Sequence, residues 1–232
     1  MTQSGSDLEG LSRRLGYVFA DVALLDQALA HRSWCSEHPG NQSNERLEFL
    51  GDAILGFVVA EIAYRRHSGL PEGKLTDLRK AVVNATSLAD VARQAGVGPE
   101  LKLGKGEAIA DGYDKSSILS DAFEAILGAV YLDGGIDAAS ALVERLIGPG
   151  LAQAVLTLGE LDQKTALQEL LARLDLKTAI YVLREEGPDH QKNFFAEVRV
   201  DNEVLGRGEG RSKKLAEVAA AREAGALLRK RV

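Results

Sequence analysis

The feature that most constrains this chain is an apolar stretch, residues 45–58, that is interrupted by acidic side chains at helical spacing. As a helix beginning near Asn44, it would place Glu45, Glu48 and Asp52 within an arc of about 60°, since each residue advances by about 100°. Most of its other positions are apolar, which is typical of a buried helix. This pattern predicts a partly enclosed acidic pocket, in which the carboxylates need compensating charge.

A second candidate helix, Ser117–Leu132, repeats this pattern. Asp121 and Glu124 are three residues apart on one face, and the remaining faces are apolar. Gly56 lies on the first acidic stripe and Gly128 on the second, and a glycine lets another backbone approach closely. We therefore expect the two helices to pack with their acidic stripes adjacent and these glycines near the contact.

Four carboxylates with no matching buried Lys or Arg predict a site for divalent cations. All-oxygen ligation suits Mg²⁺ or Mn²⁺ rather than zinc, and Mg²⁺ can activate water for attack on a phosphodiester. A structural calcium site is an alternative, although such sites usually lie in loops. A second alternative is that Glu45 and Glu48 only favour the positive end of the helix dipole. This explanation does not account for Asp52, which lies two turns into the helix.

The first two thirds of the chain predict an almost entirely helical domain. Apolar residues recur at intervals of three and four, runs of β-branched residues are few, and Gly and Pro residues separate the segments. The expected helices are Leu8–Leu15, Val22–Ala30, Asn44–Arg66, Glu72–Val82, Ala85–Ala95, Ser117–Leu132 and Ile136–Ile147.

The periodicity changes after Gly159, where a helix at 161–174 is followed by short strands at 179–184, 193–200 and 203–206. Ser212 is the expected N-cap of a last helix that runs to about Lys230. This α-β-β-β-α order predicts a three-stranded antiparallel sheet with two helices on one face. We expect a multidomain chain: an all-α domain over 1–156, with 1–6 disordered, a linker at 157–161, and a small α+β domain over 162–232.

Charge is distributed unevenly along the chain. The net charge is −6, but residues 1–158 carry 14 basic and 21 acidic side chains, while residues 159–232 carry 14 and 13. The second region is therefore denser in cations, which permits an anionic partner there despite the acidic total.

Other features narrow the class and location of the protein. Cys35 is the only cysteine, which excludes an internal disulfide framework and a Cys-rich zinc site. The apolar run 53–60 is far shorter than the roughly 20 residues of a membrane span. The first ten residues contain no apolar block typical of a secretory signal. We expect a soluble, cytoplasmic protein with no membrane partner.

Three parts of the sequence form a specific combination. They are the stretch Asn44–Ala53 (NERLEFLGDA), the stretch Lys115–Ala125 (KSSILSDAFEA) with Tyr131–Gly135 (YLDGG), and a tail with Lys164-Thr165, Leu167–Glu169, Gly187–His190 and Gly208–Glu217. His31-Arg32-Ser33 and Glu72-Gly73 belong to the same pattern. Together the first two resemble the ribonuclease III family and the tail resembles a double-stranded RNA-binding domain. The resemblance covers nearly the whole chain, in the domain order of the bacterial members.

The resemblance implies a Mg²⁺-dependent endoribonuclease that cuts both strands of duplex RNA, with Mn²⁺ as a substitute. It implies 5′-phosphate and 3′-hydroxyl ends with short 3′ overhangs, ribosomal RNA precursors and other structured transcripts as substrates, and no action on DNA. By motif position, it implies catalytic and metal-ligating roles for Glu48, Asp52, Asp121 and Glu124. Glu45 and Glu72 would border the cleavage site. It also implies a homodimer in which Phe49 contacts the partner subunit, whereas the residue pattern alone favours Phe49 in the core.

The tail is expected to bind phosphates and 2′-hydroxyls, because duplex RNA hides its base edges in a deep, narrow groove. Ser212, Lys213 and Lys214 open the last helix, where free N–H groups and the helix dipole favour phosphate. A solvated helix start is the simpler explanation of the two lysines. The resemblance adds contacts from the preceding helix and from the loop between the first two strands, at Gln168, Glu169, Pro188 and His190. Ala172 stands where some relatives have a polar residue.

A second class of function remains open, namely a protein that binds double-stranded RNA without cutting it. The presence of all four acids favours cutting. Attack through the 2′-hydroxyl would require two cooperating histidines, and the four that are present, His31, His38, His67 and His190, show no obvious pairing. His31 is interpreted as a core or capping residue. The sequence therefore favours attack by a metal-activated water.

Overall fold

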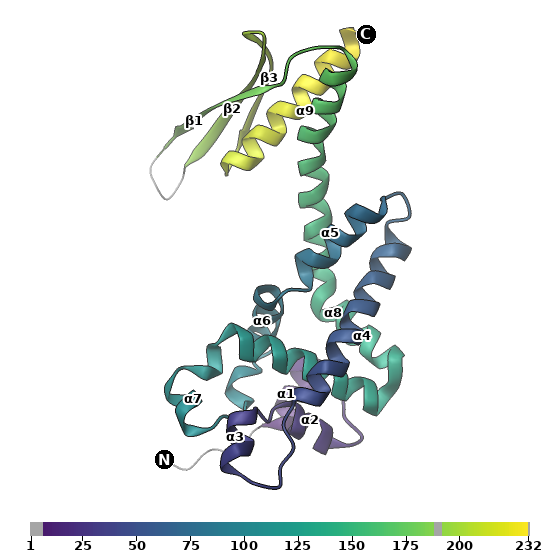
Figure 1. The fold of residues 1–232 in the computed structure, drawn as a ribbon, viewed down its shortest axis with the longest axis vertical. Coiled ribbons are helices and arrows are strands. Elements are labelled where there is room, and N and C mark those ends of the chain that lie inside the picture. Colours follow the sequence, from purple (N-terminus) through teal and green to yellow (C-terminus); the bar gives the residue numbers. More distant parts are fainter. Residues whose placement is uncertain (1–6, 188–191, 232) are drawn as a thin grey trace. The chain divides into compact units, whose positions relative to one another are not determined.

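The computed structural model describes residues 7–187 and 192–231, apart from the side chains at 160–162. The chain divides into two compact units, Met1–Ala154 and Val155–Val232. The first is helical and the second contains a three-stranded sheet with helices, as the sequence predicts (Figure 1). The expected disordered start at 1–6 and the expected RNA contacts Pro188 and His190 lie outside the described residues.

The predicted helices of the first unit are present, with additional short ones between them. In chain order the helices are α1 (Leu8–Leu15), α2 (Val22–Ala28), α3 (Arg32–Glu37), α4 (Glu45–Arg66), α5 (Glu72–Val82), α6 (Ala85–Gln94), η1 (Gly98–Glu100), α7 (Lys105–Ile109), η2 (Gly112–Asp114) and α8 (Ser116–Arg173). Helices α3 and α7 have six and five residues, too few to show an apolar period. Helix α2 ends at Ala28 because Ala30 forms a β-bridge with Lys102.

Helix α8 confirms one predicted break and not another. Gly135 has φ 75° and ψ −172°, so the break expected around residues 133–135 is a kink that uses the left-handed freedom of glycine. The break expected at 148–150 is wrong, because helix continues through Pro149. The buried side chains of Ile147 and Leu151 hold this segment against the core and offset the hydrogen bond that Pro149 cannot donate. Residues 157–161, the expected linker, also lie within the bounds of α8.

The early turns of α8 form the centre of the first unit. Its large apolar side chains there are fully buried, among them Leu119, Phe123, Ile126, Leu127 and Val130. Among the described helices, α8 alone is long and apolar enough to cross a membrane, judged by length and composition, with a mean hydropathy of 1.4 in its most apolar window. Of that window 44% is buried inside the protein, and core helices of soluble proteins pass the same test.

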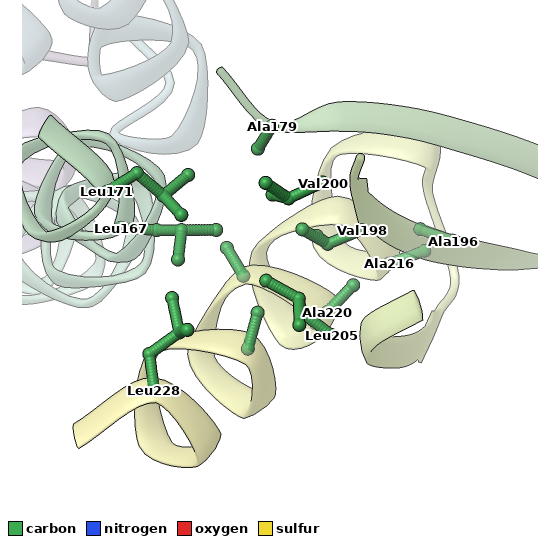
Figure 2. Packing of buried hydrophobic residues seen from close by; sticks show 12 residues of the cluster. Leu167, Leu171, Ala179, Ala196, Val198, Val200, Leu205, Ala216, Ala220 and Leu228 are labelled. Atoms are coloured by element: carbon green, nitrogen blue, oxygen red, sulfur yellow. The ribbon is translucent and has the colours of Figure 1, made fainter. Parts of the chain in front are cut away.

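The second unit packs one face of an antiparallel sheet against helices (Figure 1). Strands β1 (Ile180–Glu186), β2 (Asn193–Val200) and β3 (Glu203–Gly210) are hydrogen-bonded in this order, and α9 (Lys213–Arg231) follows. The core combines side chains from the last turns of α8, from the sheet and from α9, among them Leu167, Leu171, Val198, Val200, Leu205 and Leu228 (Figure 2).

Strand β3 is longer than predicted because its glycines serve the packing of α9. A Cβ atom on Gly206 would collide with the carbonyl oxygen of Ala220. Because glycines are unusual within strands, they made the end of this strand hard to recognise in the sequence. The turn predicted between β2 and β3 is confirmed. Asp201 and Asn202 have φ values of 49° and 68°, as a two-residue hairpin turn of type I′ requires.

Candidate active site

Helices α4 and α8 approach each other where each has a glycine. A Cβ atom on Gly51 would collide with the carbonyl oxygen of Glu124, and one on Gly128 with that of Leu47. The two backbones therefore touch, and the acidic stripes meet. The prediction for Gly128 is confirmed and that for Gly56 is wrong, since Gly56 has nothing within 4 Å. Gly56 continues the acidic stripe, whereas Gly51 lies beside it on the side toward α8.

This approach gathers three carboxylates, Glu48, Asp121 and Glu124, which we call the acid cluster. One oxygen of each side chain lies within 4.8 Å of the others, and all three residues are half-buried. The expected adjacency of the two acidic stripes is thereby confirmed. In the described part of the chain, neither Lys nor Arg forms an ion pair with any of the three. No basic side chain of the described residues is therefore paired with the cluster.

Asp52, the fourth expected ligand, lies beside the acid cluster. Its residue is exposed and its carboxylate is outside the group of three. After burial, the charge of Asp52 is among the causes that raise the pKa of Glu124 and of Glu48. Asp52 is thus within electrostatic range of the cluster, on its exposed side.

Burial and mutual repulsion disfavour the ionised form of the cluster. Burial, followed by the charges of Asp52, Asp121 and Glu48, raises the pKa of Glu124 to about 7. Burial is also the largest cause that raises the pKa of Glu48 and of Asp121. For Glu48 the charge of Asp121 comes second. Carboxyls that resist ionisation in this way have a strong preference for a neighbouring cation.

A polar hollow of about 530 Å³ opens beside the acid cluster. Its walls carry two cations: Arg32, whose nitrogen lies 4.0 Å from an oxygen of Glu45, and Lys115, which is paired with Glu107 at 2.9 Å. Its lining residues come from several elements: His31, Arg32, Ser33, Ser36, Asn44, Glu45, Glu48, Glu107, Lys115, Ser117, Ile118 and Asp121. Both signs of charge are present, so the hollow can accommodate a cation together with a phosphate group.

The two residues expected to border the cleavage site are placed differently. Glu45 lines the hollow and accepts a hydrogen bond from the hydroxyl of Ser43 at 2.7 Å. Glu72 begins α5 and accepts one from the hydroxyl of Thr76 at 2.8 Å. The residues that line the hollow do not include Glu72.

Sequence reasoning did not identify Asn44 as a site residue, although it begins the first acidic stretch. The side chain is almost completely buried and lines the hollow. Its signal in the sequence is the spacing of four residues to Glu48, which puts both on one face of α4. The interpretation of His31 as a capping residue is confirmed: it is the N-cap of α3, with its Nδ1 2.8 Å from the hydroxyl of Ser33. Burial lowers the pKa of His31.

The donor set fits a hard divalent cation. The acid cluster offers only carboxylate oxygens, which Mg²⁺ and Mn²⁺ accept, whereas protein zinc sites are built mainly from Cys and His. The half-buried, unpaired state of Glu48, Asp121 and Glu124 supplies the electrostatic need for such an ion. These three residues would hold it, with Asp52 next to them.

Helix α4 also has an exposed apolar side, which we call the outer face of α4. Phe49 is 81% exposed, Phe57 58% and Tyr64 73%. Their spacing of eight and seven residues puts them on one side of the helix. The interpretations of Phe49 as core and of α4 as buried nearly all round are therefore wrong, because this side is open to solvent in the single chain. Exposed apolar patches are typical of interaction surfaces.

The second unit presents the expected RNA contacts on helix surfaces. The Oγ of Ser212 accepts a hydrogen bond from the backbone N–H of Leu215 at 3.2 Å, so the predicted N-cap of α9 is confirmed. Lys213 and Lys214 follow in the first turn and are exposed. Two expected contacts on the last turns of α8 are exposed as well, Gln168 and Glu169.

Comparison with known proteins assigns both units. Residues 21–151 match the family described as Ribonuclease-III-like, and residues 163–228 match the double-stranded RNA binding motif. Ribonuclease 3 of Thermobifida fusca is 55% identical over 201 residues, covering 87% of this chain and 84% of that protein. Ribonuclease 3 of Streptomyces coelicolor is 51% identical over 225 residues, covering 96% and 80%.

A solved structure supports the same assignment for the first unit. The nuclease domain of Ribonuclease III from Campylobacter jejuni is 40% identical, with a TM-score of 0.58, and the match covers 62% of this chain and 98% of that one. The sequence identity to these relatives, the share of each chain that is matched and the two matched family models all indicate the same family. This chain is therefore an endoribonuclease that belongs to the ribonuclease III family.

Proposed function

We propose that the protein hydrolyses both strands of double-stranded RNA in a Mg²⁺-dependent reaction. The observation that carries the proposal is the acid cluster, whose oxygens lie within 4.8 Å of one another and are half-buried. Membership of the family and the RNA-binding motif support the substrate class. Mn²⁺ is the expected substitute, since it accepts the same oxygen ligands.

The chemistry follows from the residues at the site. When bound, Mg²⁺ would supply an activated water and stabilise charge on the leaving oxygen. Glu48, Asp52, Asp121 and Glu124 are the proposed catalytic ligands. Arg32 and Lys115, on the wall of the hollow, are suited to orient the phosphate. In-line attack by water leaves the phosphate on the 5′ end and the hydroxyl on the 3′ end.

The substrate would border the cluster at the polar hollow. Glu45 lines the hollow and is a proposed neighbour of the cleaved strand. Glu72 is proposed for the same role through the motif that it shares with the family, without support from the hollow. Short 3′ overhangs are expected if two active sites cut opposite strands at staggered positions.

A homodimer would supply these two active sites. The exposed aromatic side chains Phe49, Phe57 and Tyr64 support an apolar interface on the outer face of α4. The nuclease domain from C. jejuni is described as structurally flexible in a region involved in dimer formation. Phe49 is the proposed contact with the partner subunit.

The second unit would bind duplex RNA through its helices and one loop. The proposed contacts are Gln168, Glu169, Pro188, His190, Ser212, Lys213 and Lys214. Recognition of 2′-hydroxyls would exclude DNA. Ribosomal RNA precursors and other structured transcripts are the proposed substrates, and the cytoplasm, without a membrane partner, is the proposed location.

End-group analysis of cleaved duplex RNA tests this function. Incubation with Mg²⁺ should give fragments with 5′-phosphate and 3′-hydroxyl ends, and incubation in excess chelator should give none. Glu124→Gln should lower the cleavage rate by at least about 100-fold, because the cluster loses a ligand. Asp137→Asn, at an exposed carboxylate just beyond the kink at Gly135, is the matched control and should retain the rate.

Two results would contradict the proposal. Full cleavage in excess chelator would exclude metal-dependent hydrolysis. Binding of duplex RNA with and without Mg²⁺, with no fragments in either case, would identify the protein as an RNA-binding member that no longer cuts.

A further inference from the structure

Asn44 and Asn84 occupy the same position, the N-cap, of helices α4 and α6, but their side chains are used differently. Asn84 has an extended backbone, and its Oδ1 accepts a hydrogen bond from the N–H of Ser87 at 3.0 Å. Its amide donates to the carbonyls of Lys80 and Ala81 at 3.0 and 3.1 Å. Asn44 has a helical backbone, with φ −75° and ψ −10°, and makes no side-chain cap. Capping therefore does not explain the amide at position 44.

The amide of Asn44 is buried without a partner. Its residue is 2% exposed, and its Nδ2 finds no acceptor in the described part of the chain. The hydroxyl of Tyr181 is the one other buried side-chain atom in this condition among the described residues. Unpaired buried donors are rare and destabilising. A state of the protein in which Nδ2 has an acceptor is therefore expected.

The position of Asn44 indicates where that acceptor lies. Asn44 lines the polar hollow together with Glu48 and Asp121. Its backbone is held firmly, since its N–H donates to the carbonyl of Ala30 and its carbonyl accepts from the N–H of Glu48, both at 2.9 Å. The spacing of four residues puts the side chains of Asn44 and Glu48 on one face of α4.

Burial also limits what the acceptor can be. The Nδ2 atom has almost no surface open to solvent, so a strand of RNA cannot reach it. The acceptor must therefore come from the site itself, and a carboxylate on the same helix face is of the right chemistry. Glu48 is the carboxylate at the right spacing, and it belongs to the acid cluster.

We propose that Asn44 is a positioning residue for the cation site: with the cation bound, its Nδ2 donates a hydrogen bond to the carboxylate of Glu48 and holds that ligand in place. The inference rests on the proposed function, because it requires a cation at the cluster. Hydrogen bonds to metal ligands typically change metal affinity by about 10- to 100-fold. The unpaired amide is unfavourable in the cation-free protein, and its pairing contributes to cation binding.

Titration of the full-length protein with Mg²⁺ and with Mn²⁺, without RNA, tests this role. For Asn44→Leu, which keeps a similar volume without a donor, we expect the dissociation constant to rise by about tenfold. We expect the Tm of the cation-free variant to equal or exceed that of the wild type, because an unpaired buried donor is removed. The rise of Tm on adding the cation should be smaller. Asn44→Ala is the second variant if Leu does not fit.

Asn84→Ala is the matched control. It removes an N-cap whose hydrogen bonds are all made, so it should lower the Tm of the cation-free protein and leave cation affinity unchanged. A purely structural Asn44 would give this same result, and that outcome would overturn the proposal.

A double-mutant comparison tests whether Asn44 acts through Glu48. In a Glu48→Ala background, Asn44→Leu should change the dissociation constant by less than about twofold, since position 48 then offers no acceptor to Nδ2. An equal loss in both backgrounds would overturn the assignment to Glu48. A wild-type protein that binds neither cation would refute the proposed function instead, which separates the two failures.

Discussion

The raised pKa of Glu124 links folding stability to pH within a single residue. Burial and the charges of Asp52, Asp121 and Glu48 raise its pKa from the ordinary value of 4.5 to about 7. A carboxyl with a raised pKa stabilises the folded state fully below its unfolded pKa, and this contribution is lost as the pH rises through the folded pKa. For Glu124 the loss occurs between about pH 4.5 and 7. The cation-free protein should therefore be less stable at pH 8 than at pH 5, as far as this group is concerned.

Replacement of Glu124 by Gln should consequently stabilise the cation-free protein at pH 8. We expect an increase in the free energy of unfolding of about 1–2 kcal/mol, less than the full pKa shift implies because the side chain is partly exposed. At pH 4 the variant and the wild type should differ little in free energy of unfolding, since Glu124 is mostly protonated in both the folded and the unfolded state. Urea unfolding in chelator at the two pH values measures this. A less stable variant at pH 8 would refute this electrostatic account, and Asp137→Asn serves as the control for a carboxylate in water.

At the scale of elements, the contact of α4 with α8 determines whether the acid cluster exists. Glu48 comes from one helix, and Asp121 and Glu124 come from the other. The two helices approach closely because Gly51 and Gly128 leave room for the opposite backbone. A side chain at either glycine would separate the carboxylates as well as the helices.

Substitutions in α4 test this contact with an internal control. Gly51→Ala should lower the free energy of unfolding by about 2–4 kcal/mol, because its Cβ meets a backbone carbonyl, which cannot rotate away. It should also weaken cation binding. Gly56→Ala, five residues further along, enters open space and should raise the stability by about 0.5–1 kcal/mol through helix propensity. Equal effects at the two glycines would contradict the packing described here.

The start of α9 carries the second prediction at this scale. Replacing Lys213 and Lys214 by Ala should weaken binding of duplex RNA and reduce the salt slope by about 2, one unit for each phosphate that the variant no longer binds. Arg229 and Lys230 at the other end of α9 are exposed too, and their joint replacement by Ala is the control of equal charge. Titrations at several salt concentrations give the slopes. If both double variants reduced the salt slope equally, the RNA would be held by general charge attraction rather than by a phosphate site at the helix start.

At the scale of the whole molecule, the outer face of α4 is the feature that a single chain leaves unsatisfied. Phe49, Phe57 and Tyr64 come from the same helix that contributes Glu48 to the acid cluster. A partner on this face would therefore bring two clusters into one assembly. Association and catalysis would then be linked through α4.

Polar substitutions on this face should dissociate the proposed homodimer. Phe49→Ser together with Phe57→Ser removes much of the exposed aromatic surface, so sedimentation equilibrium should shift from dimer to monomer at micromolar concentration. Val18→Ser is the control, because Val18 is 85% exposed but belongs to another part of the first unit. A wild-type monomer, or an unchanged dimer in the double variant, would refute an interface at this face.

The local pattern of apolar and acidic residues in the sequence was sufficient to predict much of the fold and the meeting of the three carboxylates of the acid cluster. The spacing of apolar residues predicted α1, α4, α5 and α6 closely, and the change of period after Gly159 predicted the sheet of the second unit. Acidic stripes on helices that are otherwise mostly apolar predicted that Glu48, Asp121 and Glu124 would meet. These properties depend on neighbours within one or two turns, which a sequence displays directly.

Only the tertiary structure decided which surfaces meet. It showed that Gly51 rather than Gly56 faces α8, that Phe49 is exposed, and that buried neighbours carry α8 through Pro149. It also left the amide of Asn44 buried beside the acid cluster without an acceptor. Helical periodicity tells which residues share a side but not which neighbour that side packs against, because contacts between distant segments depend on how whole helices fit together.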